Sequence, residues 1–309
     1  MIKFFHSHYK MYNILGKRKY FYVFSGTLML LSIIALSAWG LKYGLDFTGG
    51  TLMEISAQGG PASGWQADGI KNILASAGIN DAVVSPTQNG YLVRYSNSSD
   101  EKNQEVLQKL KAKYPDIQNT RLDYIGPSIS SELKSKAIWA LVVAVIGITL
   151  YITYAFRKVS RPVESWKYGV GAVVALVHDV LITVGIFAIF GHFFGIEIDS
   201  SFIAALLTIL GFSVHDTIVV YDRTRENLLK SGSGEKFDET VNRSLNETMA
   251  RSINTSLTVL ITLLAIFIFG GQSIKTFTLA LLIGITFGTY SSIFVASALI
   301  VDWWKWEKK

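Results

Sequence analysis

The sequence predicts an α-helical polytopic membrane protein with six transmembrane helices and a small α+β domain between the first two. Hydrophobic residues make up 50% of the 309 residues and charged residues only 17%, which is unusual for a soluble domain. Six apolar segments are long enough to cross about 30 Å of hydrocarbon. A polar stretch, residues 43–136, separates the first two segments and carries a mixed pattern of helices and strands.

The six predicted spans cover residues 22–41, 137–156, 168–190, 202–221, 249–269 and 278–300, and none contains a proline. Tryptophans cluster near the span boundaries, where amphipathic rings prefer the membrane interface. The first span follows Lys17, Arg18 and Lys19, as the apolar region of a signal peptide would. However, its apolar stretch exceeds the roughly 7–15 residues of such a region, and no small-residue cleavage pattern follows, so an uncleaved anchor is favoured.

The distribution of lysine and arginine predicts the orientation. Basic residues gather before the first span and in the connections after the second and fourth spans, whereas the other connections carry few. The positive-inside rule therefore places both termini in the cytoplasm and residues 43–136 on the far side of the membrane. This placement explains the net charge of +6 through contact with membrane lipids, without a nucleic acid partner. The absence of cysteine excludes disulfides and thiolate metal sites.

Residues 43–136 predict the element order βαββαβ. The predicted strands cover residues 51–57, 82–85, 91–95 and 117–125, and the predicted helices cover 65–77 and 100–113, the second opening on Asp100 as its N-cap. The inward positions of the helices are Ile70, Ile73, Leu74 and Ala77, then Val106, Leu107 and Leu110. This order is typical of a ferredoxin-like split unit, and a generic small α+β domain is the alternative.

Three segments follow from these predictions: residues 1–42 with the first helix, the α+β domain 43–136 on the far side of the membrane, and a five-helix membrane domain 137–309. Within the last segment, Phe237, Val241, Leu245 and Met249 recur every four residues. This spacing predicts an amphipathic helix at the cytoplasmic membrane surface that runs into the fifth span. A Ser-Gly-Ser-Gly sequence at 231–234 predicts a flexible turn before it.

An aspartate inside the fourth span is the first candidate functional residue. The stretch "GFSVHDTIVVYDRTREN" at 211–227 places Asp216 in an apolar run. A charged side chain at the centre of a membrane helix costs about 2.5–3.5 kcal/mol on insertion scales, so it should face protein or water. Ala205, Thr208 and Ser213 make its side of the helix small and polar. The functional interpretation is a carboxylate that handles ions, and the structural alternative is a polar contact between helices.

A second carboxylate lies near the middle of the third span. His178 and Asp179 are adjacent there, and Gly171, Ala175 and Thr183 continue a small-residue stripe through Asp179. A lone histidine within a membrane is more often a hydrogen-bonding residue than a titrating one. Its position beside Asp179 adds a second interpretation, a proton relay formed by the two residues.

Arg251 is the third candidate. The purely apolar part of the fifth span, residues 257–269, is too short to cross the hydrocarbon, so the helix must begin near Met249. Arg251 then lies inside the cytoplasmic edge, and its long side chain could reach towards Asp216. The alternative is an arginine that extends to the lipid headgroups.

No enzyme signature is present. The sequence has no phosphate-binding loop, no H-E-x-x-H or G-x-S-x-G motif and no plausible metal cluster among its five histidines. We therefore expect no catalytic activity, cofactor or metal. Energy for any work would come from a partner or from the membrane potential.

Several stretches, in order along nearly the whole chain, resemble the SecD/SecF family, a branch of the resistance-nodulation-division transporters. They are "GLDFTGGTLMEI" at 44–55, "IGPSISSEL" at 125–133, "ALVHDVLITVG" at 175–185, the stretch at 211–227 and "RSINTSLTVLITLLAIFIFGG" at 251–271. The first contains the D-F-x-G-G signature, here Asp46, Gly49 and Gly50. The SecF branch fits better than SecD, whose extracytoplasmic domain is much larger.

The resemblance implies an accessory subunit of the bacterial inner membrane, with residues 43–136 as a periplasmic domain. The same resemblance implies that this subunit works with SecD and the proton-motive force to promote export of preproteins through SecYEG, with YajC as a further partner. It also implies that Asp216 and Arg251 belong to the proton pathway. The family commonly has asparagine before this aspartate, whereas this chain has His215, which could alter titration of the carboxylate. The signature turn also permits a simpler interpretation as a tight exit from the first span.

Two other functions compete with this one. A small-molecule or lipid exporter of the same superfamily predicts two large extracytoplasmic loops, and this chain has one. A receptor or scaffold gives no reason for Asp179, Asp216 and Arg251 to be buried together. The sequence leaves the coupling ion, H⁺ or Na⁺, undecided.

Overall fold

The computed structural model describes residues 11–57, 65–87, 90–96, 99–157, 163–231, 235–271 and 274–308. These residues form two compact units. The helical unit contains the chain up to Lys42 and again from Trp139 onwards, and the sheet unit is Tyr43–Ile138. The turn predicted at 231–234 lies mostly outside the described residues.

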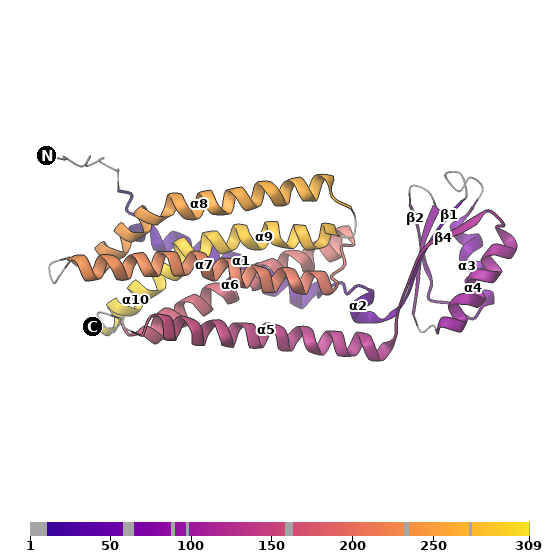
Figure 1. Cartoon of the computed structure of the whole chain (residues 1–309), viewed down its shortest axis with the longest axis horizontal. Coiled ribbons are helices and arrows are strands. Elements are labelled where there is room, and N and C mark those ends of the chain that lie inside the picture. The colour runs from indigo at the N-terminus through magenta and orange to yellow at the C-terminus, as the bar shows by residue number, and fades with distance from the viewer. Residues whose placement is uncertain are drawn as a thin grey trace. The chain divides into compact units, whose positions relative to one another are not determined.

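Within the described residues, six helices are long and apolar enough to cross a membrane, which confirms the six-span prediction by length and composition. They are α1 (Arg18–Trp39), α5 (Pro127–Ala155), α6 (Ser165–Phe194), α7 (Ser200–Ser231), α8 (Phe237–Phe269) and α9 (Lys275–Ser291). The last continues through a π segment (Ser292–Ala296) into α10 (Ser297–Glu307). Figure 1 shows these helices running side by side in the helical unit.

Small residues bring the membrane helices into close contact. A Cβ atom on Gly185 of α6 would lie 2.3 Å from the Cβ of Ser32 on α1, and one on Gly284 of α9 would lie 2.1 Å from Ile209 of α7. Lipid tails are as apolar as leucine, so helices in a membrane associate largely through close packing of this kind. Helices α6, α7 and α9 therefore form the centre of the unit, whereas α5 exposes most of its apolar surface.

The first half of α8 differs from its prediction as a helix at the membrane surface. The apolar positions Phe237, Val241 and Leu245 are buried, and they pack in the core of the helical unit. Phe237 contacts the ring of Trp304, and Asp238 forms an ion pair with Lys305 at 2.7 Å. The four-residue period was correct, but the buried face contacts protein because α10 ends beside it. The predicted continuation into the fifth span is confirmed.

Two asparagines of α8 hold the chain segment that precedes α1. Asn246 Oδ1 accepts a hydrogen bond from Tyr12 N at 2.8 Å, and its Nδ2 donates to Tyr12 O at 2.9 Å. One turn earlier, Asn242 Oδ1 accepts from Ile14 N at 2.9 Å and from Leu15 N at 3.2 Å. These side chains satisfy backbone groups as a neighbouring β-strand would. We call this arrangement the asparagine clamp.

The sheet unit contains four antiparallel strands in the order β2-β3-β1-β4. The strands are β1 (Gly50–Ala57), β2 (Val83–Pro86), β3 (Gly90–Tyr95) and β4 (Ile117–Ile125), and the helices are α2 (Leu45–Thr48), α3 (Ala67–Ser76) and α4 (Asp100–Lys113). Helices α3 and α4 cover one face of the sheet (Figure 1). All the inward positions predicted for these two helices are buried.

The cap of α4 differs from its prediction. Asp100 is the first helical residue, and Ser99 is the N-cap, whose hydroxyl accepts a hydrogen bond from Lys102 N at 3.3 Å. Both residue types cap helices well, so the sequence alone did not distinguish them. In the first turn, the charge of Asp100 favourably meets the positive end of the helix dipole.

Candidate ion-handling site

Asp179 lies on α6 at the centre of the helical unit and is 0% exposed. Its Oδ1 lies 2.9 Å from His178 Nδ1, and its Oδ2 accepts hydrogen bonds from Ser213 Oγ at 2.6 Å and Ser291 Oγ at 2.8 Å. Hydrogen bonds to a charged group contribute about 1.5–3 kcal/mol each. Donors from α6, α7 and α9 therefore stabilise a carboxylate that lipid would destabilise.

His178 is buried, yet only one of its ring nitrogens has a partner. The Nε2 atom has no hydrogen-bond partner among the described residues. The ring lies close to that of Tyr290, with the ring centres 6.2 Å apart. The structure thus joins His178 to Asp179, as the sequence suggested.

Asp216 lies on α7 and is 2% exposed. Ser256 of α8 donates a hydrogen bond to Asp216 Oδ2 at 3.3 Å, and the Ser256 hydroxyl lies 2.6 Å from that of Thr289 on α9. Ser213, which donates to Asp179, precedes Asp216 by three residues on α7. Residues three apart lie on the same face of a helix, so one face of α7 carries both Asp216 and a hydrogen-bond donor to Asp179.

Helix α9 connects the two carboxylate groups. Thr289 contacts Ser256, the residue that donates to Asp216, and Ser291 donates to Asp179. Ser292 donates to the carbonyl oxygen of Ser213 at 3.0 Å, and its hydroxyl lies 2.8 Å from that of Thr217. The sequence alone did not single out the hydroxyls of Thr289, Ser291 and Ser292. The available signal was the polar run Thr-Tyr-Ser-Ser at 289–292, inside an otherwise apolar span.

The structure does not bring Arg251 to Asp216. Arg251 is exposed on α8, and its guanidinium forms no ion pair within the described part of the chain. The neighbouring positions Ser252 and Ser256 are buried instead, and they face the bundle. Helix α8 begins at Phe237 and continues without a break through Met249, and its rotation about its axis turns Arg251 outwards.

Arg251 belongs to an outer surface of the neighbouring helices α7 and α8 that carries polar groups among exposed apolar side chains such as Ile253 and Leu257. We call this surface the α7/α8 outer face, and its exposed polar and small residues are Ala204, Thr208, Gly211, His215, Arg251, Asn254, Thr255 and Thr258. The threonine hydroxyls bond to carbonyls of their own helices, which lipid tolerates. Charged or strongly polar groups such as Arg251 and Asn254 are costly in lipid.

The signature residues Asp46, Gly49 and Gly50 belong to the sheet unit, whereas the buried carboxylates belong to the helical unit. Gly49 has φ +70° and Gly50 has φ +117°, both of which favour glycine. A Cβ on Gly50 would lie 2.5 Å from Tyr95 O, and one on Gly49 would lie 3.1 Å from Ser130 Oγ. The two glycines therefore allow β1 to begin in close contact with its neighbours, which agrees with the simpler interpretation of a tight turn.

A metal centre is not evident in the described residues, where no group of three or more histidines and acidic residues converges. The groups that meet at this position are the Asp179 carboxyl group itself, the hydroxyls of Ser213 and Ser291, and the imidazole of His178. Carboxylate and imidazole groups can take up and release protons, and the hydroxyls can pass a hydrogen bond between them.

The six apolar helices and the two buried carboxylates define a polytopic membrane protein with an ionisable centre. The family model "Protein export membrane protein SecD/SecF, C-terminal" matches residues 105–306, and the model "SecD/SecF GG Motif" matches residues 34–60. The chain therefore belongs to the SecD/SecF family of protein export membrane proteins.

Curated relatives agree with this assignment over almost their full length. The chain is 44% identical to "Protein translocase subunit SecF" of Thermobaculum terrenum over 307 residues, which cover 95% of this chain and 94% of the relative. It is 38% identical to the protein of the same name from Anaerolinea thermophila, with the same two coverages.

Solved structures show the same fold within a longer chain. The crystal structure of SecDF from Thermus thermophilus, described as a translocon-associated membrane protein, superposes with a TM-score of 0.77 at 36% identity. The match covers 95% of this chain and 38% of the SecDF chain. A second SecDF structure, in a super-membrane-facing form, gives a TM-score of 0.67 at 33% identity.

Proposed function

We propose that this chain is a SecF-type accessory subunit of the Sec translocase, and that it works with SecD to convert the proton-motive force into export of preproteins through SecYEG. The chain itself would catalyse no reaction. The observation that carries this proposal is the pair of buried carboxylate groups, Asp179 and Asp216, beside a polar face that has no partner among the described residues.

In this proposal, Asp216 takes up and releases a proton within the membrane. Protonation removes its charge and weakens the hydrogen bond from Ser256, so the contact between α7 and α8 changes. Asp179 and His178 would form a second station, joined to the first through hydroxyls of α7 and α9. A charge that crosses 100 mV gains about 2.3 kcal/mol, enough to bias a two-state movement.

The α7/α8 outer face would bind SecD. Membrane helices associate through small residues and satisfy exposed polar groups across the contact, and this face offers Gly211 beside His215. Arg251 would then reach the proton pathway across the subunit contact. That role differs from the direct approach to Asp216 expected from the sequence. YajC and the preprotein itself are further proposed partners.

A tryptophan on this face tests the proposed contact. Gly211 and Gly147 both lie in membrane helices with open space around the position of a Cβ atom, the first on α7 and the second on α5. We expect Gly211→Trp to reduce copurification of SecD in mild detergent at least tenfold, roughly 1.4 kcal/mol of association free energy, and Gly147→Trp to leave it unchanged. Equal recovery with both variants would refute this contact.

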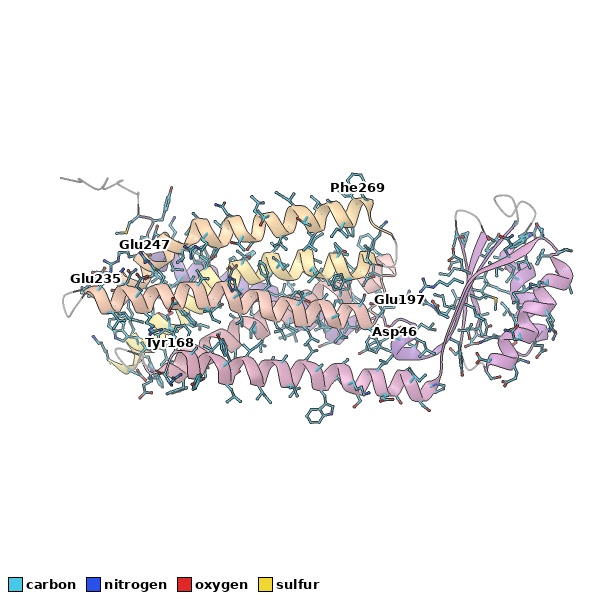
Figure 2. The ribbon with its side chains drawn as sticks, viewed as in Figure 1. Asp46, Tyr168, Glu197, Glu235, Glu247 and Phe269 are labelled. Carbon is cyan, nitrogen blue, oxygen red and sulfur yellow. The ribbon has the colours of Figure 1, made fainter. Side chains whose placement is uncertain are left out.

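The sheet unit would be a ferredoxin-like periplasmic domain that contacts the emerging preprotein. Its strand order β2-β3-β1-β4 with two helices on one face supports the fold. The basic residues support the orientation. The end of the bundle that carries Glu235 and Glu247 also carries Arg223 and Arg243, which pair with them, whereas Phe269 lies at the other end of α8 (Figure 2).

Single cysteines test the orientation, since the natural chain has none. Val83 in the sheet unit is 59% exposed, and Leu229 near the end of α7 is 79% exposed. In intact spheroplasts, we expect a membrane-impermeant maleimide to label Val83→Cys and to spare Leu229→Cys until the membrane is opened. Labelling of Leu229→Cys in sealed cells would reverse the proposed topology.

A further inference from the structure

The last long helix changes its hydrogen-bonding pattern beside Asp179. The π segment Ser292–Ala296 lies between α9 and α10, and such segments are frequent at functional sites. Ser291, immediately before it, donates to Asp179 Oδ2, and Ser292 within it donates to the carbonyl oxygen of Ser213. The π segment therefore directly follows Ser291, which donates a hydrogen bond to the Asp179 carboxyl group.

The π segment sets the rotation of α9 relative to α10. One additional residue in a helix of 3.6 residues per turn corresponds to a rotation of about 100°. Contacts with three other helices hold α10 in place: Asp302 with Arg18 and Tyr22 of α1, Trp304 with Phe237 and Lys305 with Asp238 of α8, and Glu307 with Lys167 of α6. If the π segment became α-helical while these contacts held, α9 would turn by about 100° and Ser291 would leave Asp179.

The side chain of Tyr221, on α7, bonds to the backbone of this segment. Its hydroxyl donates to Ala296 O at 3.2 Å, and the residue is 0% exposed. The ring packs edge-on against Tyr168, with ring centres 5.1 Å apart. A Cβ on Gly171 would lie 2.8 Å from the Tyr221 hydroxyl oxygen, so the absence of a side chain there leaves room for the hydroxyl.

We propose that Tyr221 is a positioning residue for the Asp179 carboxyl group and that it acts through the π segment. The hydrogen bond from the Tyr221 hydroxyl to Ala296 O stabilises the π segment with its additional residue. The π segment in turn keeps Ser291 within hydrogen-bond distance of Asp179. The inference deepens the proposed function, because it rests on Asp179 being a proton station there.

Infrared spectroscopy tests this positioning separately from transport. The stretching band of the Asp179 carboxyl group, C=O when it is protonated and COO⁻ when it is ionised, is identified as the band lost in Asp179→Asn, and it reports the hydrogen bonds to that group in the full chain purified with its partner. We expect Tyr221→Phe to shift this band in the same direction as Ser291→Ala. The double variant should shift it no further than Ser291→Ala alone, because both substitutions remove the same bond.

Tyr168→Phe is the matched control. Tyr168 is as buried as Tyr221, but its hydroxyl has no hydrogen-bond partner in the described structure, so its removal should leave the band in place. Gly171→Ala, which crowds the Tyr221 hydroxyl, should shift the band as Tyr221→Phe does and serves where that variant accumulates poorly.

The outcomes separate this inference from the proposed function. An unshifted band in both Tyr221→Phe and Gly171→Ala, or an equal shift in Tyr168→Phe, overturns the positioning role. A shifted band with unchanged proton-driven export supports the positioning role and removes Asp179 from the proposed relay. A shifted band together with a several-fold loss of proton-driven export supports both.

Discussion

Asp216→Asn is expected to abolish the proton-driven part of export while the protein inserts and assembles normally. Asparagine matches aspartate in shape and can still accept the hydrogen bond from Ser256, so the contact between α7 and α8 survives. It cannot titrate, and no proton can then be carried at this position. The measurement is the rate of preprotein translocation into membrane vesicles, with and without an imposed proton gradient.

The conservative control lies immediately before the same helix. Asp199 precedes α7, and its Oδ1 accepts hydrogen bonds from Ser201 Oγ and Phe202 N, as a capping residue does. Asparagine caps helices equally well, so Asp199→Asn should export at the unmodified rate. If Asp216→Asn also responds fully to the gradient, the carboxylate is structural and the relay through Asp216 is wrong.

Gly50→Ala is expected to cost the sheet unit about 3 kcal/mol or more of unfolding free energy, a large part of the stability of a small domain. The backbone at Gly50 has φ +117°, which side chains of L-residues rarely adopt, and the new Cβ would lie 2.5 Å from Tyr95 O. That oxygen belongs to the backbone of β3, so relief of the contact would have to separate β1 from β3. Urea unfolding of a 43–138 fragment measures the loss.

Gly78 separates the two sources of this cost. It also has a positive φ, +83°, but a Cβ there would meet no atom within 4 Å. Gly78→Ala should therefore lose only the conformational part, about 1–2 kcal/mol. Equal losses at both positions would mean that the contact with Tyr95 is not limiting, and a fragment without cooperative unfolding would count against an independent domain.

The sheet unit was largely predictable because each of its elements has a clear local pattern. Alternating residues such as Tyr91, Val93 and Tyr95 mark a half-buried strand, and the 3.6-residue stripe of Ile70, Ile73 and Leu74 marks a helix against a sheet. The choice between Ser99 and Asp100 as N-cap was not predictable, since it depends on where the chain turns before the helix.

The buried site was predictable in its carboxylates and not in their partners. An aspartate in a membrane span is costly enough to be noticed alone, so Asp179 and Asp216 stood out. Serine and threonine are common in membrane helices, and Ser291 becomes important only once α6 and α9 are placed side by side. The direction of Arg251 depends on the rotation of α8, and an apolar span that faces both lipid and protein determines that rotation weakly.

The asparagine clamp has a consequence for the order in which the molecule is made. Tyr12 and Asn246 are 234 positions apart, so the start of the chain leaves the ribosome long before the side chain that will hold it. At about 5–20 residues per second, that interval is roughly 10–50 s. Throughout it, residues 12–15 stay available to chaperones, targeting factors or the insertion machinery. Closure of the clamp then marks a late step in biogenesis, after five of the six long helices have been synthesised in part or whole.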